Sequence, residues 1–235
     1  MHYKNEFINP TLIGGGENWE VYRCEPINRI SETIIMRIPK LDFGNSNNSF
    51  HDNYKRIKNL GLPTLKFLEI DQYRGKNVII TEDLNRQGNI IFVSPNSVVP
   101  KMPALLRKLS SDMGFNQESR KHSIAEVYRY KNKIDEIIDI EKFLKEVQDD
   151  LIRASKLKLI IDFDCYFFGT SRNKNKTTIK YLLADLDNIR EAADENSYLI
   201  KQNISEFRKA FNSFLEYFVK DNENRRKYFE AVKEM

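Results

Sequence analysis

The chain has 235 residues, of which 40% are hydrophobic and 31% charged, the composition of an ordinary soluble protein with a sizeable core. Its 38 Lys and Arg against 34 Asp and Glu leave a formal charge of only +4, too small an excess to indicate nucleic-acid binding by itself. No apolar run reaches the roughly 18 residues of a membrane helix. No secretory leader is visible either, so we expect a cytoplasmic protein without a membrane partner. Cys24 and Cys165 match no metal-binding spacing, and we expect both to be reduced core residues.

The N-terminal third predicts a small β-rich lobe. Apolar and aromatic segments on both sides of Gly14-Gly15-Gly16 indicate a strand, a glycine turn and a second strand. A later segment has helical spacing, with a loop over 42–49 before it, Ser49 as its expected N-cap and Gly61 after its end. The expected elements, in the order βββαββ, are strands over 7–13, 19–24, 32–39, 65–70 and 77–82 and a helix over 50–60.

The rest of the chain predicts a mainly helical lobe. Residues 83–88 have the composition of a linker, and 89–93 are expected to form a short strand. Two helices have strong 3.6-residue apolar periodicity; the first has Asp139 as its expected N-cap, and the second carries a stripe of phenylalanines typical of a core. The expected helices cover 104–113, 140–157, 199–218 and 223–233, and 115–130 shows no clear pattern. We therefore predict an α+β fold with two lobes, 1–84 and 85–235, in one bilobal domain.

Between the two strong helices, three aspartates interrupt apolar runs. The segment is expected to form a β-hairpin with arms over 159–168 and 179–186 and a polar loop over 169–178. Asp162 and Asp164 fall in the first arm, and Asp185 ends the second. A carboxylate within a strand is costly unless a cation, a hydrogen-bond donor or water satisfies it. Each Asp alone is consistent with a turn cap, but the set, together with the glycine turn, favours a phosphate and metal site.

The glycine turn is the second part of this predicted site. Glycines let the backbone approach a phosphate closely and turn N–H groups toward it. Arg37 lies one strand later, where its guanidinium could pair with phosphate oxygens. The alternatives are a bare hairpin turn and a surface arginine.

The order of these features resembles the protein-kinase-like fold, nearest to its aminoglycoside and small-molecule phosphotransferase branch. Gly14-x-Gly16-x-x-Trp19-x-Val21 is similar to the family's G-x-G-x-x-G-x-V loop, with Gly15 inside it and Trp19 in place of the third glycine. Arg37 falls where the lysine of V-A-I-K would stand. The resemblance therefore implies that Gly14, Gly15, Gly16, Val21 and Arg37 bind the nucleotide.

Two further parts of the first lobe follow from the resemblance. Thr81 and Glu82 lie in a segment that resembles the strand entering the family's hinge, whose backbone meets the adenine edge. The helix over 50–60 takes the place of the one that carries the ion-pairing Glu. No Glu is present there, and Asp52 is the only acidic residue that could replace it.

In the second lobe the family has a catalytic loop, H-x-D-x-x-x-x-N, and a metal-binding D-F-G element. With Asp162 as the catalytic Asp, Phe167 stands at the metal-binding Asn; with Asp164, Gly169 does, so neither alignment supplies the Asn. The D-F-G element is matched by Ala184-Asp185-Leu186-Asp187-Asn188. The resemblance implies Asp162 or Asp164 as the catalytic residue and Asp185 and Asp187 as metal ligands, with ATP and Mg²⁺ as cofactors.

These residues support three hypotheses. The first is an ATP-dependent phosphotransferase acting on a small-molecule or protein hydroxyl. The second is a catalytically impaired pseudokinase, which would bind a nucleotide or a protein partner. The third, a nucleic-acid binder, is suggested by a pI near 8.8 and by aromatic residues among basic ones at 128–131 and 225–228. Those two segments fit solvated helix faces better, so we do not expect nucleic acid as a partner.

Overall fold

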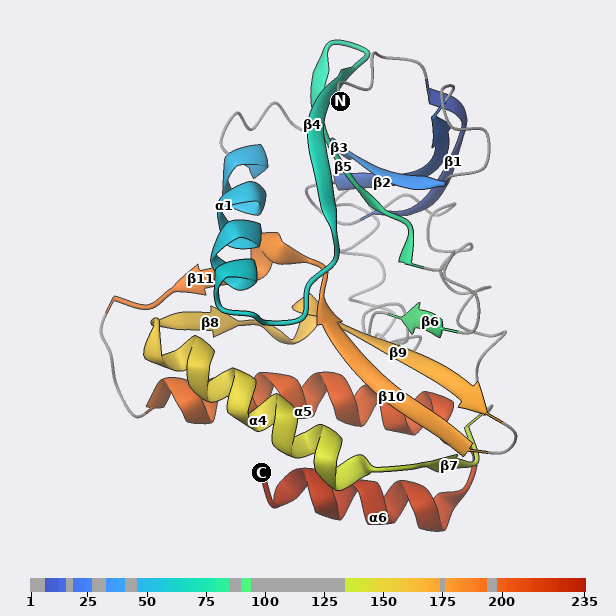
Figure 1. Cartoon of the computed structure of the whole chain (residues 1–235), viewed down its shortest axis with the longest axis vertical. Coiled ribbons are helices and arrows are strands. Elements are labelled where there is room, and N and C mark those ends of the chain that lie inside the picture. Colours follow the sequence, from blue (N-terminus) through green and yellow to red (C-terminus); the bar gives the residue numbers. More distant parts are fainter. Residues whose placement is uncertain are drawn as a thin grey trace, which may run out of the picture.

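The computed structural model describes residues 7–15, 19–26, 33–40, 46–84, 90–93, 134–173, 176–193 and 198–235. It has a β-sheet with one helix at its N-terminal end, and a C-terminal part in which three helices pack with a long hairpin (Figure 1). The expected α+β class, with a β-rich first part and a mainly helical second part, is confirmed. The expected helix over 104–113 and the segment 115–130 lie outside the described residues, and the boundary at 84 stays a prediction.

The N-terminal sheet has five antiparallel strands in the spatial order β1-β2-β3-β5-β4. A single helix, α1 (Ser46–Asn59), connects β3 to β4, so the predicted order βββαββ is confirmed. Register places Arg37 of β3 between Val21 of β2 and Ile79 of β5. The strands are β1 (Phe7–Gly15), β2 (Trp19–Pro26), β3 (Ile34–Pro39), β4 (Phe67–Tyr73) and β5 (Lys76–Glu82).

This sheet buries apolar side chains on both faces because successive strand residues point in opposite directions. One face holds a small separate cluster that contains Met36, Val78 and Ile80. The other face carries Trp19 and Ile79 into the main core. Arg37 lies beside Ile79 in the ladder, so its side chain is directed to the same side as the main core.

Helix α1 begins earlier than the sequence predicts. Residues 46–49 are helical, so the expected loop ends sooner and Ser49 lies inside the helix instead of capping it. The polar start Ser-Asn-Asn-Ser hides this first turn from an apolar pattern. Phe50 and Ile57 are fully buried, as the helical spacing predicts, and Gly61 ends the segment with φ of +66°.

Within the described residues, the C-terminal part is built around three helices. These are α4 (Ile140–Lys156), α5 (Tyr198–Phe218) and α6 (Asn222–Lys233), which lie together at the lower end of the molecule (Figure 1). The predicted phenylalanine stripe is core: consecutive rings of Phe207, Phe211, Phe214 and Phe218 stack at centroid distances of 5.5, 5.8 and 5.0 Å. Asp139 does occupy the N-cap position of α4, but it has a left-handed backbone and its side chain makes no capping hydrogen bond.

The aspartate segment differs from the simple hairpin that the sequence predicts. Its expected first arm breaks at Asp162, where a short β8 gives way to a 3-10 turn, and most of the expected loop 169–178 belongs to two long strands. Thr177 and Ile179 are buried and alternate with exposed Thr178 and Lys180, a two-residue period hidden by the polar composition. The elements are β8 (Leu159–Ile161), η3 (Phe163–Cys165), β9 (Tyr166–Asn173), β10 (Lys176–Leu183), η4 (Leu186–Asn188) and β11 (Ile189–Glu191).

Two short strands extend this hairpin. The expected strand near 89–93 is present as β6 (Ile90–Val93) and pairs with β9, while β7 (Glu136–Ile137), which the sequence did not reveal, pairs in parallel with β10. Strands β8 and β11 form a separate antiparallel pair. Because η3 follows β8 and η4 precedes β11, this pairing brings the two 3-10 turns, and the aspartates beside them, close to each other.

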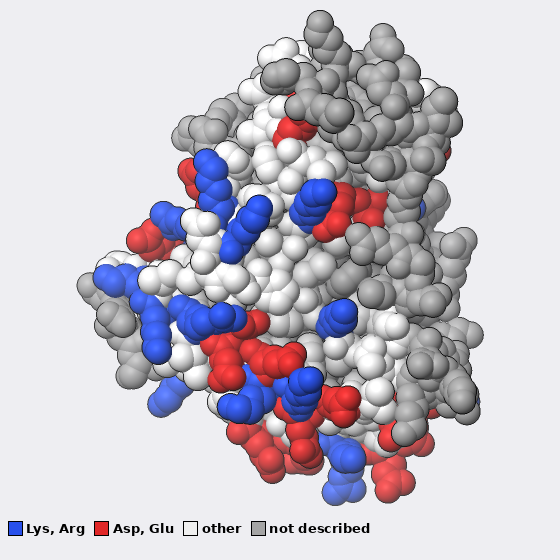
Figure 2. All heavy atoms as spheres, in the orientation of Figure 1, with Lys and Arg blue, Asp and Glu red and all other residues white. Residues whose placement is uncertain are grey.

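Other expectations concern the core and the surface. Cys24 and Cys165 are buried and free, as expected. Among the residues that the structure describes, no helix has the length and apolar character needed to cross a membrane. Figure 2 shows Lys, Arg, Asp and Glu side chains interleaved on one face. On α4, exposed side chains form the pairs Lys142–Glu146 and Lys145–Asp149. Such alternating charges are typical of a solvated helix face.

Candidate functional site

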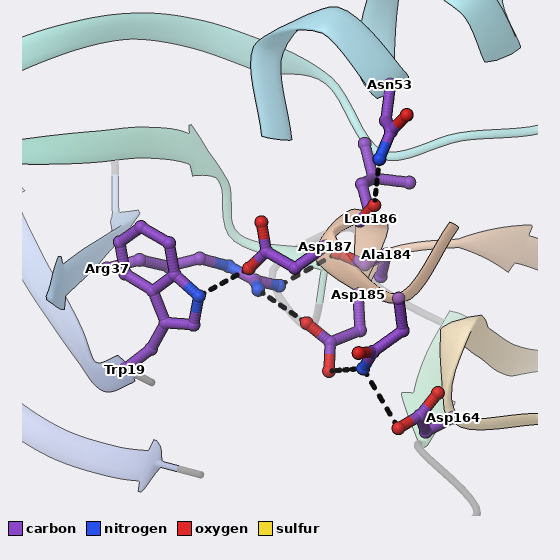
Figure 3. A network of polar contacts seen from close by, with 9 residues as sticks. Trp19, Arg37, Asn53, Asp164, Ala184, Asp185, Leu186 and Asp187 are labelled. Carbon is purple, nitrogen blue, oxygen red and sulfur yellow. Dashed lines mark hydrogen bonds and ion pairs between the residues drawn. The ribbon is translucent and has the colours of Figure 1, made fainter. Parts of the chain in front are cut away.

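An arginine from the N-terminal sheet contacts an aspartate from the C-terminal part. The Nη1 atom of Arg37 lies 3.1 Å from Oδ1 of Asp185, and its Nη2 donates to the carbonyl of Ala184 at 2.9 Å (Figure 3). The guanidinium also lies 5.2 Å from the ring centroid of Phe50 on α1. Arg37 is only 8% exposed, so this is not the surface arginine of the alternative interpretation.

A second contact links the residue after the glycine turn to the same aspartate segment. The indole Nε1 of Trp19, the first residue of β2, donates a hydrogen bond to Oδ2 of Asp187 (Figure 3). Gly14 and Gly15 pair with Val21 and Glu20 in the adjoining ladder. The Trp19 indole therefore links the start of β2 to the late aspartates, while Gly16 lies outside the described residues.

The turn η4 is held from α1 by an amide that the sequence did not single out. Asn53 donates from Nδ2 to the carbonyls of Leu186, at 2.8 Å, and Ile189, at 3.0 Å. Asp52 is exposed, and Arg37 pairs with Asp185 instead. A buried asparagine on the apolar face between Phe50 and Ile57 was the available signal. These two hydrogen bonds hold α1 against η4. In the resembling family, the corresponding helix carries a Glu that forms an ion pair.

Asp164 and Asp185 share one hydrogen-bond donor. The Nδ2 atom of Asn188 lies 2.9 Å from Oδ2 of Asp164 and 3.4 Å from Oδ2 of Asp185. The other oxygen of Asp164, Oδ1, is buried and has no hydrogen-bond partner among the described residues. Two carboxylates and one amide therefore meet at the junction of η3 and η4.

Asp162 lies at the end of β8, where the chain enters η3. Its Oδ1 accepts from Nη2 of Arg190 at 2.8 Å, and the arginine is largely exposed. The strand before it is fixed by Asn203 of α5, whose Oδ1 accepts from the Ile161 N–H at 2.9 Å and whose Nδ2 donates to the Leu159 carbonyl at 2.8 Å. This fully buried amide positions the backbone that leads to Asp162.

Two carboxyl groups of the network have pKa values well above the usual range. Burial, followed by the charges of Asp185 and Asp162, raises the pKa of Asp164 from 3.8 to about 6. Burial also raises the pKa of Asp187 to about 6, although Arg37 and the Trp19 indole act in the opposite direction. Raised carboxyl pKa values at one junction are common at functional sites, because crowded carboxylates favour a proton or a cation.

The residues expected to meet the adenine lie at the end of β5. Thr81 is 2% exposed, and its hydroxyl donates to the Glu82 carbonyl at 3.4 Å. The Glu82 N–H donates to the Lys66 carbonyl at 3.0 Å, and the Glu82 carboxylate accepts from the Lys66 N–H at 2.6 Å. The Glu82 N–H is thus engaged by the segment before β4, and adenine contact by this pair stays a prediction.

The groups at this junction that could bind a divalent ion are the carboxylates of Asp164 and Asp185, with the Asn188 amide between them. No group of three or more His, Cys, Asp or Glu side chains suited to a metal ion occurs in the described ranges. Mg²⁺ is often bound through one or two carboxylates together with phosphate oxygens and water. The buried, unpartnered Oδ1 of Asp164 and the Asp164–Asn188–Asp185 contact fit such a sparse site.

Comparisons with known proteins complete the description. No protein-family model matches the chain, and no curated protein matches it. Solved structures similar to it include the Helicobacter pylori proinflammatory kinase CtkA, with a TM-score of 0.48 and 13% sequence identity over 98% of this chain and 92% of that one. A likeness of this degree supports no statement about activity.

Proposed function

We propose that the protein is a kinase-like ATP-dependent phosphotransferase that acts on a hydroxyl group of a small molecule or a protein. The observation that carries the proposal is the network in Figure 3, in which Arg37 and Trp19 of the glycine-turn sheet contact Asp185 and Asp187 of the late segment. A basic side chain from the sheet that carries the glycines, together with crowded carboxylates, supports the proposal, since phosphoryl transfer depends on positioning and charge balance.

Each residue then has a role. The backbone of Gly14–Gly16 and the guanidinium of Arg37 bind phosphate oxygens, and Val21, Thr81 and Glu82 line the nucleotide side. Asp185 is the main metal ligand, with Asp187 beside it, and Mg²⁺ bound there would offset the negative charge of the phosphates. Asp162, at the entrance to η3, orients or deprotonates the acceptor hydroxyl.

Between the two candidates for that last role, the contacts favour Asp162. Asp162 is bonded to an exposed arginine at the surface, which an acceptor could displace. Asp164 is bonded to Asn188 and lies against the metal-side carboxylate Asp185, whose charge raises its pKa. We therefore propose Asp162 on the acceptor side and Asp164 on the metal side.

The test is a thermal-shift titration of the full chain with ATP, with and without Mg²⁺, followed by a phosphoryl-transfer assay. Stabilisation by ATP that requires Mg²⁺ and is lost in Asp185→Asn supports the metal site. Exposed Asp149, which forms an i,i+4 pair on α4, provides the matched control, and Asp149→Asn should behave as the wild type. No shift with any nucleotide would remove the proposal.

The second candidate is a pseudokinase of the same fold. It is favoured by the direct Arg37–Asp185 ion pair, since here the phosphate-binding cation already neutralises the metal-binding carboxylate. Phe167 and Gly169, at the two positions where the family's Asn is expected, both belong to β9 and offer no amide side chain. Nucleotide binding without turnover of ATP, in the presence of Mg²⁺ or Mn²⁺, would favour this candidate.

A further inference from the structure

We propose that Asn188 replaces the missing asparagine of the catalytic loop and supplies an amide oxygen to the bound divalent ion. The inference rests on the proposed function, because it requires metal-bound nucleotide at the junction of η3 and η4. Asn188 comes after the proposed metal-binding Asp185 in the chain. In the family, the asparagine comes earlier: it follows the catalytic Asp and precedes the metal-binding Asp.

The local backbone places Asn188 on the same side as Asp185. The two residues are three positions apart across η4, and the Asn188 N–H donates to the Asp185 carbonyl at 3.3 Å. Asp185 stands at the N-cap position of η4 and Asn188 is the third residue of the turn, two positions whose side chains and backbone come close at a helix start. The Asn188 amide therefore lies beside the Asp185 carboxylate because of the turn itself, and Asn53 holds that turn from α1.

The side-chain contacts place this amide where a cation would act. Its Nδ2 lies between Oδ2 of Asp164, at 2.9 Å, and Oδ2 of Asp185, at 3.4 Å. A donor between two carboxylate oxygens relieves their repulsion, as a divalent cation would. Side-chain amides carry both donors and an acceptor. Rotation about the last side-chain bond exchanges the nitrogen for the oxygen, so the same residue can accompany the carboxylates with or without the ion.

The lack of an amide side chain at the two β9 positions where the family's Asn is expected adds the second part of the argument. Gly169 is paired with Lys180 and Phe92, and Phe167 with Leu182, so both positions are committed to the strand ladder. The long β9–β10 hairpin thus begins immediately after η3, where the family's catalytic loop would run on to its Asn. Asn188, on η4, would supply the same chemical group, a side-chain amide, from the other turn of the η3–η4 junction.

The experiment measures Mn²⁺, used in place of Mg²⁺, by electron paramagnetic resonance in the presence of a non-hydrolysable ATP analogue. The proteins are the full chain, Asn188→Ala, Asn188→Asp, Asp185→Asn and Asn224→Ala. Asn224, on α6, is the matched control, because its side-chain amide also donates a hydrogen bond, to the Asp135 carbonyl at 2.8 Å. Circular dichroism and thermal melting without metal establish that each variant is folded.

If Asn188 is a ligand, Asn188→Ala binds Mn²⁺ about tenfold more weakly, the lower end of the range for groups that tune a metal site. Asn188→Asp, which keeps an oxygen, binds at least as tightly as the wild type, and Asn224→Ala is unchanged. Alternatively, Asn188 could serve only as a hydrogen-bond donor to Asp164 and Asp185, in which case the ion would have to displace it. Asn188→Ala would then bind Mn²⁺ as tightly as the wild type or more tightly, and that result overturns the inference.

The same experiment separates this inference from the proposed function. If the wild type binds Mn²⁺ and Asp185→Asn does not, but Asn188→Ala equals the wild type, only the role of Asn188 falls. If neither the wild type nor any variant binds Mn²⁺ with the analogue, the proposed function and the inference fall together.

Discussion

Arg37 and Asp185, 148 positions apart in the chain, form an ion pair with 3.1 Å between Nη1 and Oδ1. The arginine side chain is 10% exposed and the aspartate side chain 34% exposed, so the pair is largely withdrawn from water on one side and accessible on the other. It therefore joins the two parts of the protein and still leaves one carboxylate within reach of a ligand.

We expect Arg37→Met to lower the free energy of unfolding by about 2 kcal/mol, because the Ala184 carbonyl and the Asp185 carboxylate lose a charged donor. Arg37→Lys should recover part of this, since a lysine keeps the charge but not the two-nitrogen geometry. Urea denaturation measures both. The control is Arg56→Ala, whose pair with Glu191 is half exposed on each side and should contribute less than about 0.5 kcal/mol. Equal losses at both sites would contradict this assignment.

The intrinsic fluorescence of the protein should report the protonation of Asp187. Trp19 is the single tryptophan of the chain, and its indole donates to Asp187. Because the pKa of Asp187 is about 6, the emission should titrate with a midpoint near pH 6. Asp187→Asn should remove this transition, and Asp71→Asn, on β4, should leave it in place. A transition that persists in Asp187→Asn would show that another group is titrating.

Asp187 should also make stability depend on pH. Its pKa is about 6 in the folded protein and near 3.9 in the unfolded chain. The folded state thus binds more protons between these values, and the free energy of unfolding falls as pH rises from about 4 to 6. Asp187→Asn should be more stable than the wild type by roughly 2 kcal/mol at pH 7.5, and the difference should shrink toward pH 4. Denaturation curves at the two pH values test this; a difference that grows as the pH falls would have the wrong sign.

Asn203 should be one of the most sensitive polar positions in the C-terminal part. Its side chain is fully buried; its Oδ1 accepts from the Ile161 N–H, and its Nδ2 donates to the Leu159 carbonyl and the Ser155 hydroxyl. Asn203→Ala removes these three buried hydrogen bonds and should cost about 3 kcal/mol in guanidinium denaturation. The control Ser213→Ala, which removes one exposed hydroxyl bond on the same helix, should change stability by less than about 0.5 kcal/mol.

Several features of the fold could be predicted from the sequence because they depend on local periodicity. The apolar stripes of α4 and α5 repeat every 3.6 residues, and both helices occur within two residues of their expected limits. The order βββαββ followed from short apolar runs separated by glycine and polar turns. The start of α1 and the extent of the hairpin were wrong because polar residues such as Ser49 and Thr178 can occupy a helix or a strand without an apolar signal.

The candidate site was only partly predictable. Asp162, Asp164 and Asp185 stood out because carboxylates are unusual within apolar runs, and Arg37 because it is a basic residue near the end of a strand that follows the glycine turn. Asn188 gave no such signal, since an asparagine is common in turns, and Asn53 was marked only by its place between Phe50 and Ile57 on the apolar face of its helix. Their importance depends on which carbonyls and carboxylates lie opposite them.

The chain by itself determined the kinds of element and their order, because the spacing of apolar side chains limits what each segment can bury. Only the tertiary structure decided that Arg37 meets Asp185, that Trp19 meets Asp187 and that one Asn188 amide lies between two carboxylates. The contacts of Arg37 and Trp19 join residues far apart in the chain. They depend on the register of the strands and on two 3-10 turns, neither of which leaves a local pattern in the sequence.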